Sequence, residues 1–277
     1  MSLLGSHNMS HAKRKLEWLS QSVFLRFLMR LYYKRKYANT AQTIFNIRFD
    51  SPFGLACGYD ENGNLYDTLS DLGASFVEIG PITIREQDGK GVEEAVKLLR
   101  MKKPRTRLLA RITKNEFTID LESHKDFCRS MALLYDFVDA FVIDSLSGGV
   151  TQDVEDLSEV IEKLLETRRY FDVKRPIFIN ISQGLSRSEV DAILAYAMRM
   201  GLDGIVVHDC PLVEYIAKKT SGNLIIIAAG DGIGTPEMAY RMLCDGATLV
   251  EFDKAFLREG PTVFKKANQL LHFLRKS

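Results

Sequence analysis

The sequence has few of the features that mark disulfide-rich, membrane-spanning or nucleic-acid-binding proteins. Its cysteines are far apart and include no C-x-x-C pair, which is typical of reduced thiols rather than of a disulfide set or zinc site: Cys57, Cys128, Cys210 and Cys244. No apolar run reaches the roughly 20 residues that a membrane-spanning helix needs. The net charge of the 277 residues is only +1. We therefore expect a cytoplasmic protein with no nucleic-acid partner.

The sequence also lacks any Pro-, Gly- or Ser-rich stretch that would separate two domains. With 46% hydrophobic and 26% charged residues, the composition predicts one large core, and barrels of about 250 residues often form a single domain. Residues 1–8 contain Gly5-Ser6-His7 and are interpreted as the remnant of an expression tag. We expect an N-terminal helical segment over residues 9–48 and a single domain over 49–277.

The N-terminal segment is strongly basic, with eight basic side chains and one acidic side chain in residues 1–38. Apolar residues recur at helical spacing between residues 13 and 37, and Arg26, Arg30 and Lys34 form a stripe at i, i+4 spacing. Two interpretations stay open. The helix packs across the domain, or it lies on an anionic membrane surface as a peripheral anchor on the inner face.

Eight short apolar runs alternate with amphipathic segments along the rest of the chain. The runs are continuous rather than alternating, as expected for parallel strands that are buried on both faces. They lie at Phe53–Gly58, Phe76–Gly80, Leu108–Thr113, Ala140–Ser145, Pro176–Ser182, Gly204–Asp209, Leu224–Gly230 and Ala247–Asp253. The intervening helices are expected at Val92–Met101, Leu121–Leu134, Val154–Arg168, Arg187–Arg199, Pro236–Cys244 and Thr262–Leu274.

This repeat predicts an α/β fold, a (β/α)₈ TIM barrel with an N-terminal amphipathic helix. The first strand is not followed by the G-x-G-x-x-G pattern of a dinucleotide-binding sheet, which favours the closed barrel. In such barrels the chemistry lies at the carboxyl ends of the strands. The residues that end each strand are therefore the ones from which function is predicted.

Four motifs at strand ends resemble those of the dihydroorotate dehydrogenases of the membrane-associated, quinone-dependent class. They are G-L-A-C-G-Y-D-E-N-G from Gly54, V-E-I-G from Val77, a glycine-rich turn at Gly230 and E-G-P from Glu259. The resemblance covers roughly residues 49 to 274. It implies FMN-dependent oxidation of dihydroorotate to orotate in pyrimidine biosynthesis, with quinone as acceptor and an N-terminal helix for membrane contact.

The substrate site implied by the resemblance is altered at most positions. The family's catalytic serine falls on Ser147, and the two asparagines of the same loop fall on Asp144 and Gly149. The lysine that meets the orotate carboxylate in the family is Glu61, followed by Asn62. The asparagine of the strand-six motif T-N-T is Asp209. An anion at Glu61 repels an anionic substrate, so we expect slow or absent turnover of dihydroorotate.

The implied flavin site is altered as well. Small residues at Ala56, Cys57, Gly58 and Gly232 remain compatible with FMN. Arg111 stands for the family's strand-three asparagine, Asn180 for its strand-five lysine, and His208 for the first threonine of T-N-T. Asp253 and Asp231 lie in the loops expected to hold the phosphate, where two carboxylates are costly unless Lys254 or a metal offsets them. We therefore expect FMN binding to be weak or absent.

The charged residues at the strand ends leave three interpretations open. The chain is a working FMN oxidoreductase, a family member that has lost catalysis and acts as a binding or regulatory barrel, or an enzyme with altered chemistry at a carboxylate-rich mouth. We favour salt bridges such as Arg111 with Asp144 over a bound cation, and we expect no metal site. We expect a small-molecule ligand at the barrel mouth. The sequence does not predict the oligomeric state.

Overall fold

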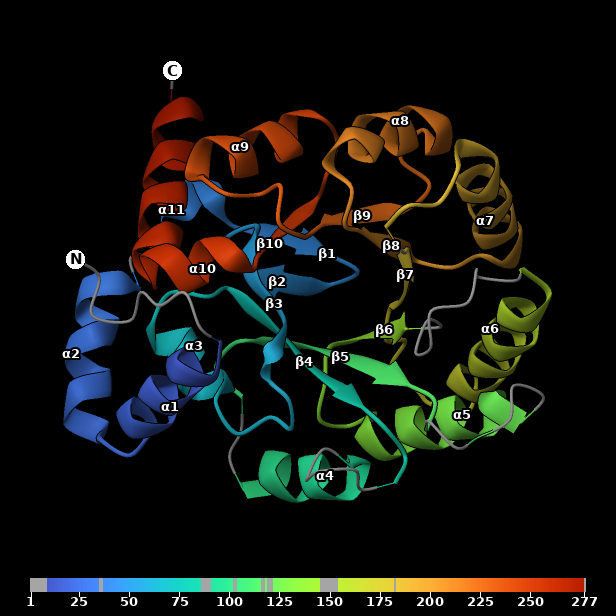
Figure 1. The fold of residues 1–277 in the computed structure, drawn as a ribbon, viewed down its shortest axis with the longest axis horizontal. Coiled ribbons are helices and arrows are strands. Elements are labelled where there is room, and N and C mark those ends of the chain that lie inside the picture. The colour runs from blue at the N-terminus through green and yellow to red at the C-terminus, as the bar shows by residue number, and fades with distance from the viewer. Residues whose placement is uncertain are drawn as a thin grey trace.

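The computed structural model describes residues 9–34, 37–85, 91–101, 104–115, 118, 122–144, 154–181 and 183–276, with the side chains of 154–156 excepted. Eight parallel strands close into a barrel in the order β10-β3-β4-β5-β6-β7-β8-β9, and helices surround it (Figure 1). The predicted (β/α)₈ barrel is confirmed.

Each predicted strand is present, within a few residues of its expected bounds. The barrel strands are β3 (Phe53–Asp60), β4 (Phe76–Ile82), β5 (Arg107–Thr113), β6 (Ala140–Asp144), β7 (Ile177–Ile181), β8 (Gly204–Val207), β9 (Ile225–Ala228) and β10 (Leu249–Phe252). The surrounding helices are α3 (Tyr66–Asp71), α4 (Val92–Met101), α5 (Ser123–Leu134), α6 (Val154–Arg168), α7 (Arg187–Met200), α8 (Cys210–Thr220), α9 (Pro236–Cys244), α10 (Lys254–Glu259) and α11 (Thr262–Leu274).

The predicted single N-terminal helix is in fact two helices. The first, α1, covers Met9–Ser20 and the second, α2, covers Val23–Tyr33. The break falls at Ser22, whose extended backbone and hydroxyl cap the second helix by accepting the amide N–H of Leu25 at 3.3 Å. A short 3₁₀ turn, η1 (Ala38–Thr40), follows.

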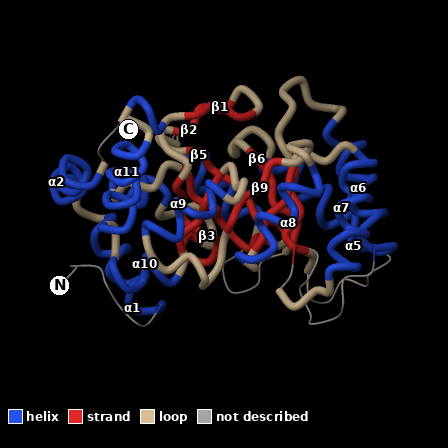
Figure 2. Tube along the Cα trace, turned by 90° about the horizontal axis from the view of Figure 1, so that it is seen from above, coloured by secondary structure: helices blue, strands red, loops and turns tan. Residues whose placement is uncertain are grey.

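A two-stranded hairpin closes one end of the barrel. The sequence did not predict it. Strands β1 (Gln42–Ile44) and β2 (Ile47–Phe49) pair antiparallel, and the turn between them places Phe45 and Asn46 at φ of 50° and 62°. Ile44, Ile47 and Phe49 pack against the apolar interior of the barrel. The hairpin lies at one end of the barrel, and α1 and α10 lie toward the other (Figure 2).

Two apolar clusters hold the fold together. The larger one lies between the barrel wall and the surrounding helices. The smaller one fills the barrel interior with inward residues from successive strands, and it includes Phe76, Leu109, Val142, Phe178, Val206 and Leu249. Side chains alternate between the two faces of a strand, so residues two positions further along each strand also point inward. This alternation determines which side chains reach the mouth.

Candidate functional site

A layer of polar side chains lies directly above the apolar interior. Two positions beyond the inward apolar residues, six strands carry a polar or charged residue: Glu78, Arg111, Asp144, Asn180, His208 and Glu251. Four of these, Arg111, Asp144, Asn180 and His208, were identified from the sequence as counterparts of family site residues, and the structure brings them together. Glu78 and Glu251 were missed because they lie inside apolar runs. We call these six residues the polar layer.

Arg111 is the cation of the polar layer. Its guanidinium is bonded to the fully buried carboxylate of Glu78 through a short contact, and its Nη1 lies 3.8 Å from Asp144 Oδ2. Although burial opposes its charge, these carboxylates keep the pKa of Arg111 above its ordinary value. The salt bridge expected between Arg111 and Asp144 is therefore present, but Glu78 is the closer partner.

Asp144, Asn180 and His208 continue the polar layer as a chain of hydrogen bonds. The amide Nδ2 of Asn180 donates to Asp144 Oδ1 at 3.2 Å, and its Oδ1 lies 2.7 Å from His208 Nε2. Burial, reinforced by the charge of Arg111, lowers the pKa of His208. The ring is thus neutral near pH 7, and its Nε2–H donates to the Asn180 oxygen. The Asn180 side chain is thus held in the layer by one hydrogen bond on each side.

The fully buried carboxyl groups of Glu78 and Glu251 complete the layer. No N–H group of the described residues reaches either oxygen of Glu251 or Oε2 of Glu78, and the two carboxyl groups hydrogen-bond to each other. Burial raises the pKa of Glu251 well above its usual range, and the negative charge of Glu78 raises it further. Burial also raises the pKa of the neighbouring Cys57 thiol, which keeps it in the unreactive thiol form.

The turn after β3 carries the position where the family has its substrate lysine. Glu61 is tied to the N-terminal helix α1, because Lys13 Nζ lies 2.6 Å from its Oε1. Asn62 is half-buried in the same turn. The turn is held by Asp60, whose carboxylate accepts the backbone N–H groups of Asn64 and Leu65 at 2.8 and 3.0 Å.

The loops after β9 and β10 are occupied by internal contacts. Lys254 pairs with Asp231 through a short contact, and Asp253 accepts the hydroxyl of Tyr59 at 3.3 Å. Burial raises the pKa of Asp253 above its ordinary value. Gly232 has no room for a side chain, since a Cβ there would lie 2.7 Å from the sulfur of Cys210.

The remaining predicted positions are described by their burial and their place in the fold. Ala56 is buried in β3, Cys57 and Gly58 are half-buried beside it, and Asp209 is half-buried at the start of α8 without capping it through its side chain. The catalytic position, Ser147, lies outside the described residues, as does Gly149.

The residues in the loops after β9 and β10, and Asn180 on the ring side, do not fit a flavin mononucleotide. Of the two cations near the loops that would face the phosphate, Lys254 is already paired with Asp231, and Arg258 donates to the carbonyl oxygen of Gly234. Asp231 and Asp253 would both face a dianion there. On the ring side, Asn180 stands where the family has a lysine, and it is bonded to Asp144 and His208.

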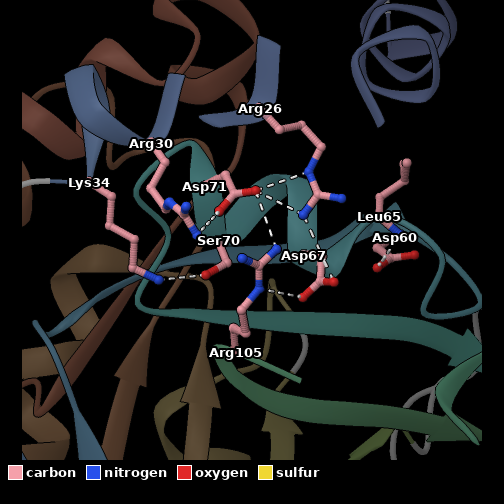
Figure 3. A network of polar contacts seen from close by, with 9 residues as sticks. All are labelled: Arg26, Arg30, Lys34, Asp60, Leu65, Asp67, Ser70, Asp71 and Arg105. Carbon is pink, nitrogen blue, oxygen red and sulfur yellow. Dashed lines mark hydrogen bonds and ion pairs between the residues drawn. The ribbon is translucent and has the colours of Figure 1, made fainter. Parts of the chain in front are cut away.

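The basic stripe of the N-terminal segment contacts α3 on the barrel, with Arg30 still partly exposed (Figure 3). Arg26 on α2 lies 2.8 Å from Asp71 and 3.8 Å from Asp67 on α3, and Lys34 donates to Ser70 at 2.6 Å. Arg105 approaches the same two aspartates at 3.5 Å. Of the two interpretations, packing across the barrel accounts for this stripe.

Beside the basic stripe, α1 and α2 carry exposed apolar side chains. Trp18, Phe24 and Leu31 are 64%, 69% and 66% exposed. Phe24 and Phe27 also line an open cavity of about 560 Å³, together with Val23, Arg26, Arg30, Asp71 and Arg105. None of the described helices is both long and apolar enough to cross a lipid bilayer.

Fold and site together define a (β/α)₈ barrel of the kind that carries its functional groups at the mouth. No protein-family model matches the chain. It is 25% identical over 298 aligned residues to the dihydroorotate dehydrogenase (quinone) of Christiangramia forsetii, covering 86% of this chain and 87% of that one. The enzyme of the same name from Sulfurimonas denitrificans is 28% identical, with 85% and 81% covered.

Solved structures show the same fold. The dihydroorotate dehydrogenase of Eimeria tenella, in complex with ferulenol, superposes with a TM-score of 0.85 at 21% identity, covering 98% of this chain and 92% of that one. A mandelate oxidase structure gives a TM-score of 0.54 at 14% identity. The chain is therefore similar to dihydroorotate dehydrogenases over most of its length, at 25% and 28% identity to the two enzymes named above.

Proposed function

We propose that this protein is a dihydroorotate dehydrogenase-like barrel that no longer oxidises dihydroorotate and instead binds a small molecule at its mouth. The observation that carries the proposal is the polar layer. Arg111 is bonded to Glu78, and Asn180 is bonded to Asp144 and His208. In the family, these positions would face flavin or substrate. Here their side chains bond to one another instead.

The charge of the mouth supports the same proposal. The family's substrate is an anion, whereas Glu61 presents a carboxylate that is already paired with Lys13. The pair therefore offers the substrate no free cation at the position where the family has a lysine. The carboxyl groups of Asp231 and Asp253 likewise disfavour binding of a flavin phosphate, which is a dianion. Because substrate and cofactor are both anionic, these carboxylates disfavour both.

The test measures flavin content and turnover on the purified protein. We expect no flavin absorbance after incubation with FMN and gel filtration, and no reduction of a quinone by dihydroorotate. The double variant Glu61→Lys/Asn180→Lys restores two family lysines and serves as a comparison. A wild-type kcat in the ordinary range of about 1–10³ s⁻¹ would refute the proposal and establish an active FMN oxidoreductase.

We further propose that the exposed apolar face of α1 and α2 contacts the membrane surface, as a peripheral attachment. The family relatives carry "quinone" in their names, and an apolar acceptor is reached from the bilayer. Because the basic stripe is paired with α3, attachment should depend on apolar insertion more than on lipid charge.

Vesicle sedimentation tests the attachment. We expect binding to vesicles of neutral phosphatidylcholine as well as to anionic ones, and loss of binding in Phe24→Asp/Leu31→Asp. The exposed Tyr170, far from this face in sequence and 87% exposed, gives the control variant Tyr170→Asp. Failure to bind either type of vesicle would contradict the proposal.

A further inference from the structure

The cavity between α2 and the barrel combines an apolar wall with three arginines. Its volume is about 560 Å³, within the range of about 300–1,000 Å³ that is usual for small-molecule sites. The lining residues are Val23, Phe24, Arg26, Phe27, Arg30, Asp71 and Arg105. Three guanidinium groups and one carboxylate therefore line the cavity, and with the neighbouring Asp67 the group still carries one surplus positive charge (Figure 3).

Only one of the three arginines is held by a strong contact. Arg26 Nε donates to Asp71 Oδ2 at 2.9 Å. Arg105 reaches the aspartates of α3 at 3.5 Å, and Arg30 lies 4.0 Å from Asp71. Both distances are longer than the about 2.7–3.2 Å of an N–H···O hydrogen bond. Because a guanidinium group carries five N–H donors, Arg30 and Arg105 have donors left for another acceptor.

The apolar wall stands beside these donors on the same helix. Val23, Phe24 and Phe27 are exposed. Residues 23, 26, 27 and 30 follow helical i, i+3 and i, i+4 spacing, so they share one face of α2. The guanidinium of Arg30 lies over the ring of Phe27, 5.6 Å from its centroid. A ligand that fills this cavity therefore meets an apolar surface and a positive charge side by side.

The cavity is separate from the mouth. Arg105 lies two residues before β5 begins, so it is at the amino-terminal end of that strand, whereas the mouth is at the carboxyl ends. Asp71 ends α3, and the chain then turns into the amino-terminal end of β4 at Phe76. An inference about this cavity therefore does not depend on what the mouth binds.

We propose that this cavity binds a single-chain anionic amphiphile, with its head group at Arg30 and Arg105 and its alkyl chain against Val23, Phe24 and Phe27. Guanidinium groups bind carboxylate and phosphate oxygens through paired, charge-assisted hydrogen bonds. A fatty-acid carboxylate and an alkyl phosphate share this chemistry, and the experiment below distinguishes them. The inference goes beyond the proposed membrane contact, because apolar insertion requires no particular head group and this cavity selects one.

Isothermal titration of the purified full chain tests the inference, with octanoate and octyl phosphate as probes below the concentrations at which they form micelles. The comparison ligands are octan-1-ol, octylammonium and inorganic phosphate. We expect saturable binding of at least one anionic amphiphile, and the tighter of the two identifies the preferred head group. The alcohol, the ammonium and free phosphate should bind about tenfold more weakly or not at all. Because Arg30 and Arg105 are partly exposed, affinity for the anion should fall with rising salt.

Two variants locate the site. Arg30→Gln removes the charge that is least engaged with Asp71, so it should fold as the wild type does, which a thermal melt verifies, and it should weaken binding of the anion about tenfold or more. Phe27→Ala should also weaken binding but leave its salt dependence unchanged. The control is Arg199→Gln on α7, whose guanidinium lies over the ring of Tyr196, and it should bind the anion as the wild type does.

Absence of saturable binding by both anionic amphiphiles would overturn the inference. Equally tight binding of octan-1-ol would overturn it as well, as would binding that Arg30→Gln leaves intact. Flavin content and dihydroorotate turnover test the proposed function at the mouth, and vesicle sedimentation tests the attachment, so the failure of each proposal has its own measurement.

Discussion

Arg111 is 8% exposed, and its nearest carboxylate, on Glu78, is fully buried. A buried ion pair adds little net stability because both charges lose their hydration. Removing one partner is costly, since the other charge stays buried without compensation. The sequence identified Arg111 and Asp144 because they stand at positions where the resemblance places asparagines of the family's site. It did not identify Glu78 and Glu251, because in strands buried on both faces hydropathy does not distinguish the inward from the outward positions.

We expect Arg111→Met to lower the free energy of unfolding by about 3–5 kcal/mol, as for other broken buried pairs. Urea denaturation measures this. The double variant Arg111→Met/Glu78→Leu removes both charges and should recover most of the loss. A single variant as stable as the wild type would contradict the placement of this pair.

Asp60 makes the stability depend on pH. Burial raises its pKa from 3.8 to about 6, against the backbone N–H groups that lower it. The folded state therefore holds a proton that the unfolded state has lost between about pH 4 and pH 6. The contribution of this group to stability falls by about 3 kcal/mol as the pH rises through that window, and it is constant above it.

Asp60→Asn should remove this contribution. We expect the difference in free energy of unfolding between wild type and variant to change by about 3 kcal/mol, against the wild type, from pH 4 to pH 7. Chemical denaturation across this range measures it. A difference that is independent of pH would show that Asp60 keeps its ordinary pKa.

At the scale of elements, the N-terminal helices show what periodicity reveals and what it does not. Helical spacing correctly indicated helix and two faces, but it joined α1 and α2 because the cap at Ser22 is one short polar residue among many. It also could not determine which face the barrel covers. That depends on Asp67 and Asp71 of α3, a helix of six residues that carries no long apolar pattern.

Arg26 should anchor α2 more strongly than Arg30 does. The Arg26 side chain is 11% exposed and 2.8 Å from Asp71, whereas Arg30 is 38% exposed and 4.0 Å away. We expect Arg26→Ala to cost about 1–3 kcal/mol and to speed hydrogen exchange in α2. Arg30→Ala should cost under about 1 kcal/mol. Equal effects of the two variants would contradict this docking geometry.

At the scale of the whole molecule, the eight-fold repeat was sufficient to predict the barrel, because parallel strands buried on both faces leave continuous apolar runs. The hairpin that closes one end was missed, since strands of three residues are too short for a periodic signal. The roles at the mouth were beyond prediction for a different reason. They depend on which side chains pair with one another; the sequence indicated Arg111 with Asp144, but it did not indicate the closer partner Glu78 or the bonds of Asn180 to Asp144 and His208.

The hairpin should be a main support of the fold. Phe49 is 4% exposed and meets the ring of Phe76 edge-on at 5.7 Å. We expect Phe49→Ala to lower the free energy of unfolding by about 3–5 kcal/mol, the usual cost of deleting a buried ring. Tyr170→Ala, at an exposed position, should change it by less than about 0.5 kcal/mol. Thermal and chemical unfolding compare the two.

Because β1 and β2 pack against the apolar interior, the barrel is closed at one end and open only at the mouth. A molecule that reaches the polar layer must leave by the way it entered, and a second molecule must wait for the first to depart. Any two ligands that need the innermost position therefore compete, and they bind and leave one after the other.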